Sequence, residues 1–254
     1  MQATPVASSG ASVSTGLATA LSGAVTIVQS GTNDGSIAWS FALDNSLVQY
    51  LAKDETVTAT YCITVTDDSG AENNSQTQDV TVTITGTNDI PTITAVSTDA
   101  VGAVTEDAAA TTLSDSGTIT FNDVDLIDVH NASVVASNSN TLGGTLTFGS
   151  VTESASTEPG SVGWTYSVAN SAVQYLAENQ TATESFTVTV SDGQGGSVTE
   201  DVTVTITGDN DAPTITAVST DAVGAVTEDA AATTLSDSGT ITFNDVDLID
   251  VHNA

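Results

Sequence analysis

The sequence predicts an all-β chain built from tandem domains, and three observations support this prediction. Thr, Val, Ser and Ala dominate while aromatic residues are only 4% of the 254 residues, which favours half-buried strands over helices. Several segments alternate apolar and polar residues, the period of a strand with one buried face. Residues 91–132 recur letter for letter as 213–254, an offset of 122 residues that matches the size of a whole domain. Repetition at this scale indicates an array, so the function should benefit from repetition.

The first predicted strand with a clear inner face occurs in both copies of the domain. Residues 35–41 correspond to residues 160–166, and in each segment aromatic residues alternate with small polar ones. This period of two places Trp39 and Trp164 on the buried face of a strand, where we expect both to act as core anchors.

A short motif and further strands follow in each copy. Val-Gln-Tyr-Leu-Ala at 48–52 and 173–177 breaks the alternation, so we expect a helical turn that crosses from one sheet to the other. The glycine-rich run 192–196 supplies the positive-φ residues of a hairpin turn, and the first copy has a longer version. The remaining strands are expected at 58–66, 80–84, 92–96, 117–121, 185–191 and 202–206.

Domain boundaries are predicted where a glycine is followed five residues later by a proline. This pattern, at 86–91 and 208–213, ends one strand and begins an extended segment. It divides the chain into a partial domain at 1–89 that lacks its first strands, a complete domain at 90–211, and a partial domain at 212–254 that consists of first strands alone.

The charge balance limits the possible partners. Asp and Glu total 32 residues, Lys and Arg total one, and the net charge is −31. Without a basic surface, nucleic acid and anionic membranes are excluded as partners, and we expect no membrane insertion. Unpaired carboxylates at this density repel one another, so high salt or bound divalent cations must screen them. A merely solubilising acidic surface and a cation-binding surface are both compatible with this composition.

Residues with the chemistry of a catalytic site are not apparent in the sequence. No nucleophile lies in a recognisable motif, no arginine is present to stabilise an anion, and no glycine-rich phosphate loop follows a strand. We therefore expect that the protein is not an enzyme. The single cysteine, Cys62, excludes a disulfide framework within one chain.

Acidic residues cluster at strand ends and in the linkers. Asp123 and Asp125 are two positions apart, so in extended chain their carboxylates project from the same face. Clusters of oxygen ligands suit Ca²⁺, whereas no His or Cys set suits zinc. An isolated residue of this kind is better explained as a solvated turn aspartate, whereas several clusters that meet at each boundary favour a cation site. His130 and His252 are interpreted as surface or capping residues. The candidate metal ligands are Asn88, Asp89, Glu106, Asp107, Asp123, Asp125, Asp192, Asp209, Asn210, Asp211, Glu228, Asp245 and Asp247.

Several of these motifs resemble those of one known family. Asp-Asn-Asp-Ala-Pro at 209–213 is similar to the cadherin linker signature, and the whole unit resembles the cadherin-like VCBS repeat of large bacterial surface adhesins of the RTX type. The matching motifs are Thr-Glu-Asp at 105–107, Phe-Asn-Asp-Val-Asp at 121–125 and Ser-Asp-Gly-Gln-Gly-Gly at 191–196.

The resemblance implies tandem cadherin-like (Ig-like) Greek-key β-sandwich domains with Ca²⁺ at or near the domain junctions, at an extracellular or cell-surface location. It assigns ligand roles to the linker residues 209–211, to the Asp123 and Asp125 pair, and to Asp192. Thr87 stands where Asp209 stands in the second linker, so the first junction is expected to bind fewer ions or to bind them less tightly.

Three functions are compatible with the sequence. The first is a structural extender module of a secreted bacterial surface adhesin or extracellular matrix fibre, stiffened by Ca²⁺ at the linkers between neighbouring repeats. The second is a filament subunit whose C-terminal strands complete the N-terminal half-domain of an identical subunit, head to tail; if 1–254 is a window of a longer array, neighbouring repeats of the same chain do this instead. The third is a carbohydrate-binding β-sandwich that takes surface glycans, against which stands the inner-face placement of Trp39 and Trp164.

Overall fold

The computed structural model describes residues 3–31, 35–72, 74–107, 110–218, 220–228, 230–231 and 233–253, with side chains from residue 11 onward. Met1 and Ala254, which bound the first and last predicted domains, lie outside the described residues. Within the described part of the chain, no helix is long and apolar enough to cross a membrane.

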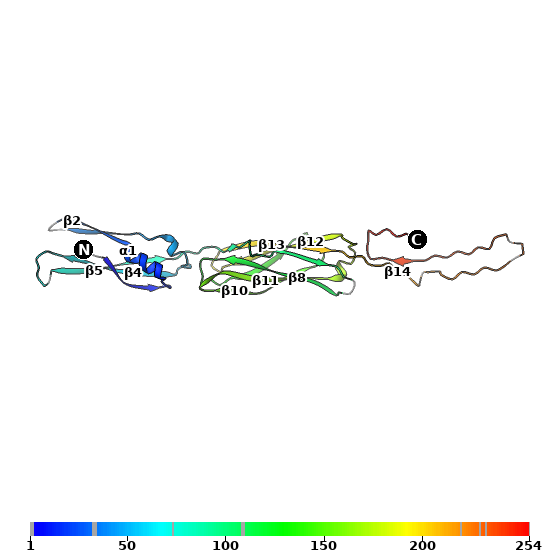
Figure 1. Ribbon diagram of the computed structural model, residues 1–254, viewed down its shortest axis with the longest axis horizontal. Helices are drawn as coiled ribbons and strands as arrows, with labels where there is room; N and C mark the ends of the chain where they lie inside the picture. Colours follow the sequence, from blue (N-terminus) through cyan, green and yellow to red (C-terminus); the bar gives the residue numbers. More distant parts are fainter. Residues whose placement is uncertain are drawn as a thin grey trace.

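Two sheet-bearing units and a C-terminal segment follow one another along an elongated molecule, and the C-terminal segment extends outward and returns so that the chain ends near β14 (Figure 1). The first unit contains β1 (Ala3–Gly10), α1 (Thr15–Gly23), β2 (Val25–Ser30), β3 (Ser36–Phe41), η1 (Asn45–Leu47), β4 (Thr56–Thr66) and β5 (Ser75–Thr85). The second contains β6 (Thr92–Ile93), β7 (Val101–Thr105), β8 (Thr112–Asn122), β9 (Asn131–Ala136), β10 (Thr145–Ser154), β11 (Thr157–Ala169), η2 (Asn170–Ala172), β12 (Thr181–Ser191) and β13 (Ser197–Thr207). In the C-terminal segment, residues 212–253, the described residues form the short pair β14 (Thr214–Ile215) and β15 (Phe243–Asn244).

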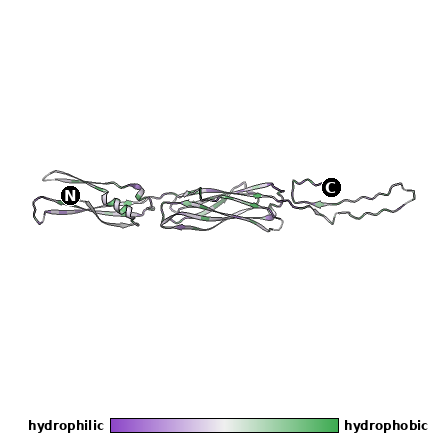
Figure 2. Cartoon of the chain, viewed as in Figure 1, coloured by the Kyte–Doolittle hydropathy of each residue, from purple (hydrophilic) through white to green (hydrophobic). Residues whose placement is uncertain are grey.

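The second unit is a sandwich of two four-stranded sheets, with strand orders β10-β11-β8-β6 and β7-β13-β12-β9. All neighbours are antiparallel except β7, which runs parallel to β13. Alternate residues of the facing strands, such as Ile119, Val188 and Val204, are fully buried between the sheets. Figure 2 shows hydrophobic stretches along the strands of both sheet-bearing units. The prediction of an all-β chain with Greek-key sandwich architecture is confirmed.

Helix α1 is the main departure from the strand pattern. Ser14 caps it, because the Ser14 hydroxyl accepts a hydrogen bond from the Leu17 backbone N–H at 3.1 Å. Leu17 and Leu21 lie one turn apart on the same face and are buried in the core of the first unit. Their spacing of four, preceded by a serine cap, is the local signal for this helix.

The turns follow the sequence prediction closely. The Val-Gln-Tyr-Leu-Ala motif at 48–52 and 173–177 overlaps a non-strand turn in each copy, immediately after the single 3₁₀ turns η1 and η2. Strands β12 and β13 form a hairpin in which Gly193 and Gly195 have φ angles of 75° and 118°. A side chain at either position would be strained, so glycine is required there.

The first unit has the sheets β1-β4-β5 and β2-β3. By sequence and register, β3 corresponds to β11 and β5 corresponds to β13. In the second unit β11 also pairs with β8 and β13 also pairs with β7, whereas among the described residues β3 and β5 each carry a strand on one side only. Compared with the second unit, the described part of the first unit therefore leaves one edge of β3 and one edge of β5 open.

The open edges explain why one predicted core residue is not buried. Trp164 is 1% exposed, its indole Nε1 donates to the Asp99 carbonyl at 2.7 Å, and its ring occupies the space where a Cβ on Gly117 would lie. Trp39, the equivalent residue in the first unit, is 46% exposed. The prediction that Trp39 is a buried core anchor is wrong in this structure, because among the described residues no strand lies beside β3 in the position that β8 takes beside β11.

Candidate metal centres at the two junctions

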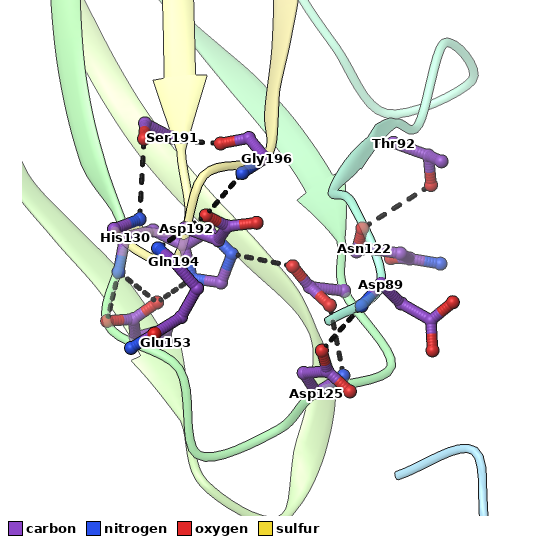
Figure 3. Close-up of polar contacts among 12 residues, drawn as sticks. Asp89, Thr92, Asn122, Asp125, His130, Glu153, Ser191, Asp192, Gln194 and Gly196 are labelled. Atoms are coloured by element: carbon purple, nitrogen blue, oxygen red, sulfur yellow. Dashed lines mark hydrogen bonds and ion pairs between the residues drawn. The ribbon is translucent and has the colours of Figure 1, made fainter. Parts of the chain in front are cut away.

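The first junction is formed where the linker after β5 meets the loops at one end of the second unit. The linker contributes Asn88 and Asp89, the loop between β8 and β9 contributes residues 123–130, and the β12–β13 hairpin contributes Asp192. Glu153 joins them from the end of β10. Figure 3 shows Asp125, His130, Glu153 and Asp192, which come from separate parts of the chain, gathered at this end of the second unit, with the Asp89 side chain directed away from them.

Hydrogen bonds fix the positions of the paired aspartates relative to the linker. The Asp89 backbone N–H donates to Asp125 Oδ2 at 2.7 Å, and the Asp125 N–H donates to Asp123 Oδ1 at 3.0 Å. Asp125 is completely buried and Asp123 is 6% exposed. The expected convergence of this pair is met in part, since the contact runs through backbone N–H groups and each carboxylate keeps one oxygen for another partner.

Three carboxylates form the tightest cluster at this junction. Asp123, Asp128 and Asp192 each offer an oxygen within 4.8 Å of the others, and all three are buried. Asp192 Oδ1 accepts hydrogen bonds from the N–H groups of residues 194–196 at 2.7 to 3.0 Å, while its Oδ2 accepts from Asn88 Nδ2 at 2.9 Å. The hairpin glycines thus allow the backbone to wrap around the Asp192 carboxylate and hold it in place.

The buried oxygens without a hydrogen-bond donor are concentrated at the junctions. Within the described residues, five buried side-chain N or O atoms lack a partner, and every one is an oxygen at one of the two junctions. They are Asn88 Oδ1, Asp125 Oδ1, Asp128 Oδ2, Asp211 Oδ2 and Asp247 Oδ1. Leaving a buried acceptor unpaired is costly, so these atoms need either a hydrogen-bond donor, such as water, or a cation.

Electrostatic repulsion is visible in the pKa values of the same groups. Burial, reinforced by the negative charges of Asp123, Asp89 and Asp128, raises the pKa of Asp125 to about 6. Burial and nearby carboxylates also raise the pKa of Asp128. Burial opposes ionisation of Asp192 as well, but the hydrogen bonds from Asn88 and the hairpin N–H groups outweigh it and hold the pKa of Asp192 below its usual value.

These shifts predict how stability depends on pH when metal is removed. A carboxyl whose pKa rises from 3.8 to about 6 on folding, as that of Asp125 does, stabilises the fold below pH 3.8, and this stabilisation is lost as the pH rises through about 6. In a chelator, the free energy of unfolding measured in urea should therefore increase as the pH is lowered from 7 to 5. Asp125→Asn should flatten this profile, and a wild-type profile that falls over the same range would contradict the prediction.

His130 is not a surface residue, contrary to the sequence interpretation. It is 6% exposed, and its ring lies between Asp123 Oδ2, 3.1 Å from Nε2, and Glu153 Oε2, 2.7 Å from Nδ1. The His130 N–H also donates to Glu153. The His130 ring therefore holds one oxygen of Asp123, Oδ2, in position. Its copy His252 contacts Asp245 Oδ2 at 2.7 Å but is less buried.

The second junction, where the linker after β13 meets the C-terminal segment, repeats the same backbone contacts. The Asp211 N–H donates to Asp247 Oδ2 at 2.9 Å and the Asp247 N–H donates to Asp245 Oδ1 at 3.0 Å, as in the first junction. Glu106, only 2% exposed, accepts from the Asp209 N–H at 3.1 Å and from the Gln174 amide. Burial and the charges of Asp211, Asp209 and Asp247 raise the pKa of Glu106.

The structure brings together most of the predicted ligands but separates a few. Asn210 is exposed and its amide donates to the Asp211 carbonyl at 3.2 Å. Glu228, the copy of Glu106, is exposed in the C-terminal segment, and Asp107 is exposed beside the buried Glu106. Sequence reasoning missed Asp128 and Glu153. The position of Asp128, three residues after Asp125 in the same loop, was an available signal, whereas Glu153 gave none.

Comparison with known proteins adds few constraints. No protein-family profile matches the chain, and no curated protein matches it. Among solved structures it is similar to the mouse clustered protocadherin PcdhgC3 EC1-3, at TM-score 0.36 and 14% identity over 90% of this chain and 68% of that one. It is also similar to zebrafish RET cadherin-like domains 1 to 4 (TM-score 0.32, 12% identity, 74% of this chain) and to protocadherin gammaB7 EC3-6 (0.33, 13%, 76%). The chain covers 42% of each of these last two.

Proposed function

We propose that the chain is a structural extender module of a secreted bacterial surface adhesin or extracellular matrix fibre, in which Ca²⁺ at the junctions stiffens the array. The observation that carries this proposal is the set of buried side-chain oxygens at both junctions that have no hydrogen-bond partner. They come from the linker and from the loops of the following unit, so one cation contacting them would join two parts of the array. The domain division at residues 90 and 211 belongs to the same proposal.

The donor set fits calcium better than a transition metal. The available ligands are carboxylate, amide and carbonyl oxygens, and Ca²⁺ takes six to eight such oxygens in flexible geometry. At the first junction Asn88, Asp89, Asp123, Asp125, Asp128 and Asp192 would hold the ion. At the second, Glu106, Asp209, Asp211, Asp245 and Asp247 would do so. Both ring nitrogens of His130 already contact carboxylates, so this imidazole is not available to bind zinc at the first junction.

The mechanical effect follows from the positions of the ligands. Without a cation, the clustered carboxylates repel one another across the linker, which favours conformations that separate the units. A bound divalent cation, when present, neutralises this charge. The hydrogen bonds from Asp89 to Asp125 and from Asp211 to Asp247 then hold each linker against the next unit and restrict the angle between neighbours.

Small-angle scattering on the full chain tests this proposal. With Ca²⁺, the distributions of the maximum dimension and of the angle between units should be narrower than after chelation, because the linkers lose their restraint when the metal is removed. Mg²⁺ at the same ionic strength is the control for general charge screening, since it requires stricter octahedral geometry. Scattering curves that are identical in Ca²⁺, Mg²⁺ and chelator would exclude the stiffening role.

A second candidate function is a filament subunit, and one observation favours it. The first unit has two open sheet edges, and the C-terminal segment carries copies of the strands that close those edges in the second unit. Glycan binding stays a prediction, since the exposure of Trp39 has a simpler origin in the open edge of β3.

A further inference from the structure

A row of three polar side chains connects the two sheets at the junction end of the second unit. Glu153 lies near the end of β10, His130 immediately precedes β9, and Asp123 immediately follows β8. Strands β8 and β10 belong to one sheet and β9 belongs to the other. Figure 3 shows the Glu153 side chain against the His130 ring. Contacts among these three residues therefore join the proposed ion-binding loop to both layers of the sandwich.

The His130 ring is fixed by three partners. It packs on Phe121, with the two ring centroids 4.6 Å apart. Its Nδ1 lies 2.7 Å from Glu153 Oε2, and its Nε2 lies 3.1 Å from Asp123 Oδ2. Ionised carboxylates only accept hydrogen bonds, so both ring nitrogens donate in this arrangement. The His130 backbone N–H also donates to Glu153 Oε1 at 3.2 Å, so Glu153 holds the main chain as well as the ring.

Both oxygens of the Asp123 carboxylate are hydrogen-bonded as a result. Oδ2 accepts from the His130 ring, and Oδ1 accepts from the Asp125 backbone N–H at 3.0 Å. One hydrogen bond to each oxygen fixes the plane of the carboxylate, while a second lone pair on each oxygen remains for a metal. This same carboxylate belongs to the tight cluster with Asp128 and Asp192. Its orientation is therefore set without help from an ion.

The contact between histidine and aspartate recurs in the repeated sequence. His252 Nε2 lies 2.7 Å from Asp245 Oδ2, and the His252 ring centroid lies 4.7 Å from that of Phe243. In both copies the contact forms within one short stretch of chain, so the local sequence is sufficient for it. Glu153 comes from a different strand, and it is the partner that tertiary folding adds in the second unit.

We propose that Glu153 and His130 are positioning residues for the Ca²⁺ site at the first junction and act through the Asp123 carboxylate. The inference rests on the proposed function and extends it to two residues that do not themselves bind the ion. Partners that hydrogen-bond to metal ligands orient those ligands, and the loss of one such partner typically lowers metal affinity by about 10- to 100-fold. A ligand that is already held in place also loses less conformational freedom when the ion binds.

The test compares Glu153→Ala with Glu153→Gln in the full chain, by calorimetric titration with Ca²⁺ at one constant pH. The binding step that Asp192→Asn weakens identifies the first junction. Glu153→Ala leaves His130 Nδ1 without its acceptor and should weaken this step by about 10-fold or more. Glu153→Gln removes the same charge but keeps an oxygen that accepts from the ring, so it should restore most of the lost affinity. Glu72→Ala, at an exposed position between β4 and β5, is the matched control and should bind as wild type does.

His130→Ala separates positioning from charge by the sign of its effect. A ring that donates at both nitrogens is positively charged, so a purely electrostatic role predicts tighter Ca²⁺ binding when the ring is removed. A positioning role predicts weaker binding. Tighter binding by His130→Ala, wild-type affinity in Glu153→Ala, or equal losses in the two Glu153 variants would each overturn the inference, and Ca²⁺ binding by the wild type would leave the proposed function intact. A wild-type chain that binds no Ca²⁺ would overturn both.

Discussion

Asp125→Asn is expected to change the stability of the second unit in opposite directions with and without calcium. In chelator the substitution removes a buried negative charge from beside Asp123 and Asp128, whose repulsion raises the pKa of Asp125 to about 6. After allowance for solvent screening, this relief should stabilise the fold by about 1–2 kcal/mol. The asparagine oxygen can still accept the hydrogen bond from the Asp89 N–H.

In saturating Ca²⁺ the same substitution should be destabilising. It removes a charged ligand, and a ligand present at 100 to 1,000 times its Kd stabilises the folded state by about 2.7 to 4.1 kcal/mol, part of which is lost as affinity falls. Urea unfolding of both proteins, with and without Ca²⁺, measures the two effects. Asp201→Asn is the matched control: it removes the same charge from an exposed strand position and keeps an acceptor for the Thr187 hydroxyl. The same sign of change in both conditions for Asp125→Asn would argue against Asp125 as a ligand.

Local patterns were sufficient for most of the strands and for the paired aspartates. Alternation of apolar and polar residues is visible within a single strand, and the spacing of Asp123 and Asp125 is itself local. Helix α1 was missed because its two leucines are embedded in a Ser, Thr and Ala background that resembles the strands. Glu153 reaches the site through tertiary folding, which brings the end of β10 to the loop that follows β8, whereas Asp128 lies in that same loop.

The contrast between the two tryptophans shows a different limit of sequence reasoning. Trp39 and Trp164 occur in nearly the same local sequence, so any local rule assigns them the same burial. Their exposures differ because burial depends on whether a strand with a glycine lies alongside, and that strand comes from residues more than 40 positions earlier in the chain. Similar local patterns therefore predict secondary structure well and burial less well.

Trp164→Ala should be among the most destabilising single substitutions in the second unit. The ring is 1% exposed, fills the space over Gly117 and donates to the Asp99 carbonyl. Removing a buried aromatic side chain of this size costs about 3–5 kcal/mol, because it leaves a cavity and, here, also an unpaired carbonyl.

Trp39→Ala is the matched comparison for this experiment. In the isolated molecule Trp39 is 46% exposed, so its loss should change the free energy of unfolding by less than about 1 kcal/mol. Urea unfolding of dilute samples, followed by near-ultraviolet circular dichroism, gives both values. If the first unit has an unpaired edge in dilute solution, the two substitutions must differ strongly. Equal, large losses would mean that a strand covers Trp39 even in the monomer. The description of β3 as a strand with one unpaired edge would then be incorrect.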